Sequence, residues 1–186
     1  MTAWKGTLSL YDHLEGFETE LPEAISFDIA RAEAHHGPVS IDGHALAWEL
    51  APGAPDRGAA LLSHAVSLEG DAWIARCDRI DFPPGGIAYT HTHPGPGIRY
   101  LLEGTLTIRS EGRTTEYAAG DPWFEAGPEP VHATAALDRA SAFVRVLLLP
   151  AEWAGRRTIR HVDPDDERKP KLQRPTVFFD RVIALR

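Results

Sequence analysis

The sequence lacks several features that would place it in a membrane, on a nucleic acid or outside the cell. Its single cysteine, Cys77, cannot form a disulfide within the chain, which favours a reducing compartment. No apolar run is long enough to span a bilayer, and the first residues lack the apolar segment of a signal peptide. The formal net charge is −8, and no basic run occurs outside the tail. We therefore expect a cytoplasmic protein with no membrane or nucleic-acid partner.

Helix signals are scarce as well, and strand signals take their place. Apolar alternation in 25–29 and 46–50 predicts strands in an N-terminal extension over 1–58, which ends in a loop rich in glycine and proline. From residue 59 to 150, short strand signals alternate with turn residues, a rhythm typical of an all-β barrel or sandwich of the jelly-roll kind. The expected strands are 60–68, 72–82, 87–93, 98–102, 105–110, 114–118, 123–125, 131–135 and 142–149.

The pattern changes after Pro150. A charged segment, 163–171, is expected on the surface, whereas 176–185 is apolar again. An apolar terminal segment is expected to dock on the barrel or on a partner subunit, so we assign 151–186 to a C-terminal extension. Pairing between the edge strands of two copies would give a homodimer.

Two histidines stand one residue apart at the end of an expected strand. On an extended backbone, His91 and His93 point to the same side and can present both imidazoles to one point. His132 lies on a later strand signal, and antiparallel pairing could bring it alongside them. Three imidazoles suit a divalent transition metal rather than magnesium or calcium.

The stretch that contains this pair resembles the first motif of the cupin superfamily. Gly85 is followed after five residues by His91 and His93, then by a short loop and an apolar strand that ends at Gly104. The segment from Gly120 to Gly127, followed by His132, resembles the second cupin motif. The resemblance implies a cupin-type double-stranded β-helix, that is, a jelly-roll barrel, with the two extensions outside it.

The motifs depart from the cupin pattern at the metal ligands. The glutamate that usually binds the metal aligns with Gly97, and the second motif has one residue too few before Gly127 and two too many between Gly127 and His132. The resemblance implies one metal ion held by His91, His93 and His132. Because three-histidine iron sites occur in cupin dioxygenases, Fe(II) is favoured over zinc, nickel, manganese or copper.

Three further side chains are candidates for the site. Glu125 could be a compensating ligand, a general acid/base, or a carboxylate at the rim. If Gly97 faces inward, so does Arg99, which would meet an acidic substrate or pair with Glu103 or Glu125; otherwise Arg99 lies on the outer face. Tyr89 could donate a hydrogen bond to substrate or pack within its strand.

Two functions follow from these residues. The first is a metal-dependent enzyme acting on a small polar or aromatic molecule, with dioxygenase-like chemistry favoured over a lyase or isomerase reaction. There Arg99 would orient an acidic group and Glu125 would move protons. The second is a cupin module that binds or senses a small ligand without turnover.

Overall fold

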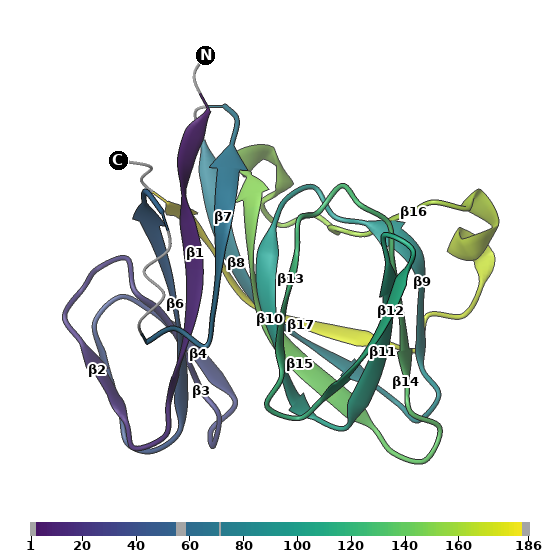
Figure 1. Ribbon diagram of the computed structural model, residues 1–186, viewed down its shortest axis with the longest axis horizontal. Helices are drawn as coiled ribbons and strands as arrows, with labels where there is room; N and C mark the ends of the chain where they lie inside the picture. The colour runs from purple at the N-terminus through teal and green to yellow at the C-terminus, as the bar shows by residue number, and fades with distance from the viewer. Residues whose placement is uncertain (1–2, 55–58, 71, 184–186) are drawn as a thin grey trace.

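The computed structural model describes residues 3–54, 59–70 and 72–183, and it is built almost entirely of β-strands (Figure 1). The helical elements in this part of the chain are two 3-10 turns, η1 (Ala151–Trp153) and η2 (Pro164–Arg168). Among these residues no helix is long and apolar enough to cross a membrane. The all-β, jelly-roll fold predicted from the sequence is confirmed.

The N-terminal part forms a five-stranded antiparallel sheet with the order β4-β3-β6-β1-β7 and a small β2–β5 ladder beside it. β7 was expected among the strands after residue 59, but it pairs with β1 in this sheet. The residues 55–58 of the expected boundary loop lie outside the described residues. The strands are β1 (Trp4–His13), β2 (Phe17–Thr19), β3 (Ile25–Asp28), β4 (Glu33–His36), β5 (Val39–Ile41), β6 (Ala45–Pro52) and β7 (Leu62–Leu68).

The barrel consists of two five-stranded antiparallel sheets with the orders β13-β10-β15-β8-β17 and β12-β11-β14-β9-β16. The C-terminal extension adds one strand to each sheet, β16 beside β9 and β17 beside β8. The strands are β8 (Trp73–Phe82), β9 (Ile87–Thr92), β10 (Gly97–Glu103), β11 (Thr105–Ser110), β12 (Arg113–Ala118), β13 (Pro122–Glu125), β14 (Val131–Ala135), β15 (Ser141–Pro150), β16 (Arg160–His161) and β17 (Arg174–Ile183).

The sheet that contains β15 has apolar neighbours on both faces. Cys77, Val144 and Val146 on its outer face pack against Leu10 and Trp48 of the N-terminal sheet. Its other face lines the inside of the barrel. Burial on both faces explains why β15 is almost continuously apolar, since neither face needs polar side chains.

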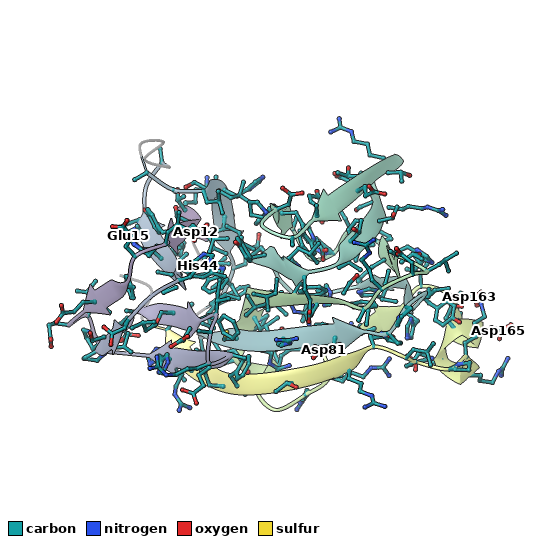
Figure 2. The ribbon with its side chains drawn as sticks, turned by 90° about the horizontal axis from the view of Figure 1, so that it is seen from below. Asp12, Glu15, His44, Asp81, Asp163 and Asp165 are labelled. Atoms are coloured by element: carbon teal, nitrogen blue, oxygen red, sulfur yellow. The ribbon has the colours of Figure 1, made fainter. Side chains whose placement is uncertain are left out.

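The two ends of the molecule carry different polar contacts (Figure 2). At the N-terminal end, His44 Nε2 lies 2.5 Å from Asp12 Oδ1 and links the end of β1 to the turn before β6. At the far end, Asp163 caps η2 by accepting a hydrogen bond from the Asp165 backbone N–H. The barrel lies between these ends, and its interior holds the candidate site.

Candidate ligand-binding site in the barrel

A cavity of about 430 Å³ lies inside the barrel. This volume falls in the range of about 300–1,000 Å³ that is usual for small-molecule sites. Thr158 and Ile159 line it from the segment after η1, and Val177 lines it from β17. The remaining wall includes eight apolar side chains, Ile80, Phe82, Ala88, Ile108, Trp123, Val131, Ala133 and Phe143. It also includes six polar or charged side chains outside the site described below, Arg76, Arg156, Arg157, Lys171, Gln173 and Asp180.

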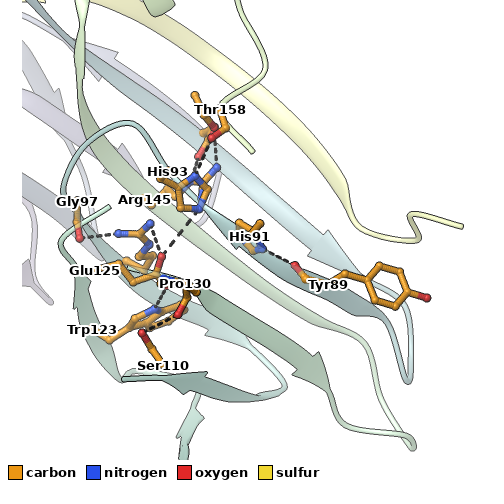
Figure 3. A network of polar contacts seen from close by, with 12 residues as sticks. Tyr89, His91, His93, Gly97, Ser110, Trp123, Glu125, Pro130, Arg145 and Thr158 are labelled. Carbon is orange, nitrogen blue, oxygen red and sulfur yellow. Dashed lines mark hydrogen bonds and ion pairs between the residues drawn. The ribbon is translucent and has the colours of Figure 1, made fainter. Parts of the chain in front are cut away.

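The polar part of the wall contains the predicted histidine pair (Figure 3). His91 and His93 both line the cavity, and their ring centroids lie 4.9 Å apart at an interplanar angle of 86°. Both residues are buried. The structure therefore places the two imidazoles together, as alternation along an extended strand predicts.

Backbone carbonyls fix the direction of each imidazole. His91 Nδ1 donates to the carbonyl oxygen of Tyr89 at 2.7 Å, and His93 Nδ1 donates to that of Thr158 at 3.3 Å. Since a carbonyl oxygen can only accept, Nε2 of each ring is left as the acceptor. Burial lowers the pKa of His91 to about 4. Burial, and next the charge of Arg145, lower the pKa of His93 well below its ordinary value, so both rings are neutral at pH 7.

Arg145 of β15 completes this polar cluster and is not among the residues predicted from the sequence. Its Nη1 lies 3.3 Å from His93 Nε2, the acceptor nitrogen. Its Nε and Nη2 donate to the two carboxylate oxygens of Asp78 on β8, at 2.6 and 3.0 Å. Both Arg145 and Asp78 are buried. The available signal was that Arg145 is the one charged residue in the apolar strand 141–150.

Arg99 faces inward, which settles the orientation that the sequence left open. Its side chain is fully buried, and its Nη2 forms an ion pair of 2.6 Å with Glu125 Oε2. Trp123 Nε1 donates to the other carboxylate oxygen at 2.9 Å. Glu125 lines the cavity, whereas Arg99 lies behind it and is not among the lining residues. Arg99 thus contacts a carboxylate of its own chain, whereas Arg145 lines the cavity, as do Arg76, Arg156 and Arg157.

Two predicted residues lie away from the cavity. His132 stands on β14 between Val131 and Ala133, which line the cavity, so alternation turns its side chain to the outside of the barrel. The structure therefore does not bring His132 to the histidine pair. The ring of Tyr89 also points away (Figure 3) and lies under Lys169 Nζ, 4.9 Å from the ring centroid; only its carbonyl oxygen serves the site.

The arrangement does not fit the expected metal ion. Among the described residues, no three His, Cys, Asp or Glu side chains are grouped to hold one. Glu125 Oε2 lies 3.9 Å from His93 Nε2 but is held by Arg99, and His93 Nε2 itself faces the Arg145 guanidinium. A Cβ added at Gly97 would approach the carbonyl oxygen of Val146 to 2.4 Å, so the usual cupin glutamate has no room there.

The match to one family model agrees with the fold. Residues 78–135 match the family model of the cupin domain. No curated protein matches the sequence. The solved structures similar to it include an RmlC-like cupin from Shewanella frigidimarina NCIMB 400, at 20% identity and a TM-score of 0.38, over 42% of this chain and 68% of that one.

Two enzymes are also among these structures. The polyketide cyclase RemF from Streptomyces resistomycificus has 23% identity and a TM-score of 0.40, over 50% of this chain and 63% of that one. Salicylate 1,2-dioxygenase from Pseudoaminobacter salicylatoxidans has 10% identity and a TM-score of 0.40, over 95% of this chain and 68% of that one. Identities and TM-scores this low carry no information about the activity of this chain. The match identifies residues 78–135 of this chain as a cupin domain.

Proposed function

We propose that the barrel binds a small molecule with an aromatic body and an oxygen-bearing polar end. The observation that carries this proposal is a cavity wall that combines aromatic and aliphatic side chains with a cluster of mostly buried polar side chains. Burial of an apolar ring against such a wall supplies binding energy, and a few polar groups fix its orientation. The polar cluster is His91, His93, Asp78, Glu125 and Arg145.

The hydrogen-bonding atoms that the cluster leaves free indicate which chemical groups the polar end of the ligand would carry. Within the described part of the chain, His91 makes a hydrogen bond only through Nδ1, which leaves Nε2 to accept from a hydroxyl group. Arg145 offers N–H groups to an oxygen such as a carbonyl or carboxylate. A ring that carries a hydroxyl next to an acidic oxygen matches both positions.

Calorimetric titration with 3-hydroxy-2-naphthoate tests the proposal, because this probe combines a bicyclic apolar body with those two groups. Ala133→Leu fills part of the cavity and is expected to weaken binding by about tenfold or more through overpacking. Thr134→Leu is the matched control, since its side chain lies on the other face of the same strand and should leave the affinity unchanged. Absence of binding, or equal effects of the two variants, would refute the proposal.

A metal-dependent enzyme is the second candidate, with Fe(II) favoured and zinc, nickel, manganese or copper as alternatives. The observation in its favour is that both Nδ1 atoms are held by carbonyl oxygens, an arrangement that orients histidines for ligation through Nε2. Binding of a metal ion would require the Arg145 guanidinium to move away from His93 Nε2 and the Glu125 carboxylate to move away from Arg99. Oxygen uptake that depends on both added iron and an aromatic substrate would favour this candidate.

A further inference from the structure

We propose that the Arg145 guanidinium occupies the position on His93 that a metal ion would take, so that this barrel binds the oxygen of an anionic ligand through a fixed protein cation. The inference rests on the proposed function, because it states what the polar end of that cavity recognises. It assigns to Arg145 the role of a specificity-determining residue.

The first argument is that His93 has one lone pair available. Its Nδ1 donates to the carbonyl oxygen of Thr158, so only Nε2 can accept a hydrogen bond or bind a metal. Arg145 Nη1 lies 3.3 Å from that nitrogen. Because one lone pair cannot serve a guanidinium N–H and a metal ion together, the arginine and the metal exclude each other at this atom.

The second argument is that Arg145 is held in place. Two hydrogen bonds join it to Asp78, and both residues are buried with 4% and 2% of their surface exposed. The register aligns Arg145 on β15 with Asp78 on β8, so the pair bridges neighbouring strands of one sheet. Moving the guanidinium aside would leave a buried carboxylate unpaired, which is strongly unfavourable.

The third argument is the balance of charge around the cavity. Each buried arginine already has a carboxylate partner, so a divalent ion would add two positive charges without a counter-charge of their own. Lys171 lines the cavity, and its Nζ donates to the carbonyl oxygens of Asp166 and Lys169, which leaves its charge available to a ligand. The three pairs are Arg145–Asp78, Arg99–Glu125 and Arg76–Asp180.

These arguments favour a ligand with an anionic oxygen, such as an aromatic carboxylate or phenolate. The oxygen would bind Arg145 while a neighbouring hydroxyl donates to His91 Nε2. Arginine suits this task because its charge persists in a buried site and its N–H groups lie in a plane that matches a carboxylate.

The first experiment titrates chelator-treated wild-type protein with Zn²⁺ and, without oxygen, with Fe²⁺, and compares it with His91→Ala. We expect the two proteins to bind either ion equally weakly, since the histidine pair is not available as a metal site. Binding of one ion per chain that is about tenfold or more tighter in the wild type than in His91→Ala would overturn the inference.

The second experiment titrates 3-hydroxy-2-naphthoate into chelator-treated protein. Arg145→Lys keeps a cation beside Asp78, so the fold should persist, but it loses the planar guanidinium; we expect binding to weaken by about tenfold or more. Arg109→Lys is the matched control, because Arg109 is exposed on β11 and should bind as the wild type does. A third titration uses 2-naphthol, which lacks the carboxylate. Its affinity should differ much less between Arg145→Lys and the wild type.

The outcomes separate this inference from the proposed function. If the naphthoate binds no form of the protein, with or without metal, the proposed function fails. If it binds only after zinc or iron is added, the proposed function stands and the inference about Arg145 is wrong. Binding to metal-free protein that Arg145→Lys does not weaken would also overturn the inference.

Discussion

Arg99 and Arg145 lie directly opposite each other on the antiparallel strands β10 and β15. Like charges in opposed positions repel, and inside a barrel water cannot screen them. Each guanidinium is therefore balanced by its own carboxylate, Glu125 for Arg99 and Asp78 for Arg145. The barrel interior thus carries a row of paired charges across one sheet, and the stability of the protein should depend on each carboxylate in that row.

Glu125→Gln should lower the free energy of unfolding by about 3 kcal/mol, because it leaves the fully buried Arg99 without a counter-charge. Glutamine can still accept from Trp123 Nε1, so the loss reports on the charge. Glu103→Gln is the control; its side chain is 58% exposed and pairs with Arg79 at the surface, so it should cost less than about 1 kcal/mol. Urea denaturation measures both, and similar losses would contradict the expected role of Glu125.

Asp180→Asn should loosen residues 155–159, which line the cavity. Asp180 accepts hydrogen bonds from Arg76 Nε at 2.6 Å, Arg76 Nη2 at 2.7 Å and the Gly155 backbone N–H at 2.7 Å. Loss of the negative charge should increase amide hydrogen exchange in residues 155–159 and speed ligand release. Asp138→Asn, at a surface pair with Arg139, should change neither quantity. Unchanged exchange in 155–159 would show that Asp180 does not fasten this segment.

Stability should fall as the pH decreases from about 6.5 towards 4, because His91 stays neutral in the native state while the unfolded chain takes up a proton. Its pKa of about 4 lies below the ordinary value of 6.5, so the unfolded state binds more protons in this window. The pKa difference between the unfolded and native states corresponds to a loss of about 3 kcal/mol in the free energy of unfolding. This loss is complete only below the native pKa. The pKa of His93 is also lowered in the native state, so this residue adds to the loss of stability in acid.

Denaturation of His91→Gln as a function of pH checks this expectation. Glutamine does not titrate, so the slope of stability between pH 6.5 and 4 should decrease. His64→Gln, at an exposed position, serves as the control. A slope equal to that of the wild type would mean that His91 is not buried in its neutral form.

Gly97→Ala should destabilise the protein by about 1–3 kcal/mol, because the added Cβ would approach Val146 O to 2.4 Å. Gly70→Ala separates this crowding from backbone strain, since Gly70 has a φ of +99° but open space where the added Cβ would lie. Its cost should be about 1 kcal/mol. A larger loss for Gly70→Ala than for Gly97→Ala would contradict the close packing of β10 on β15.

The homodimer expected from the sequence stays a prediction. β17 is an edge strand of its sheet, and Val182 on it is 73% exposed. Pairing of two β17 edges would cover this side chain. Val182→Lys should then shift the mass measured by light scattering from dimer to monomer. A wild-type protein that is monomeric at every concentration tested would refute this prediction.

The local patterns predicted the fold and the juxtaposition of one histidine pair. Turn residues and alternation identified the barrel strands, and the spacing of His91 and His93 alone puts both imidazoles on one side. Arg145 and Asp78 were missed because β15 and β8 are distant in the sequence, and their register decides which side chains meet. His132 was misplaced because its orientation depends on the phase of β14, which pairs with β9 across a register shift.

The hydrogen bond from His93 Nδ1 to the carbonyl oxygen of Thr158 has a consequence for the imidazole itself. Thr158 lines the cavity, so a residue of the cavity wall decides the tautomer of His93. With this hydrogen bond the proton stays on Nδ1, and Nε2 can meet Arg145. Without it, the proton could exchange between the two nitrogens. The backbone of the cavity wall, and not the imidazole alone, thus decides which nitrogen of His93 accepts a hydrogen bond.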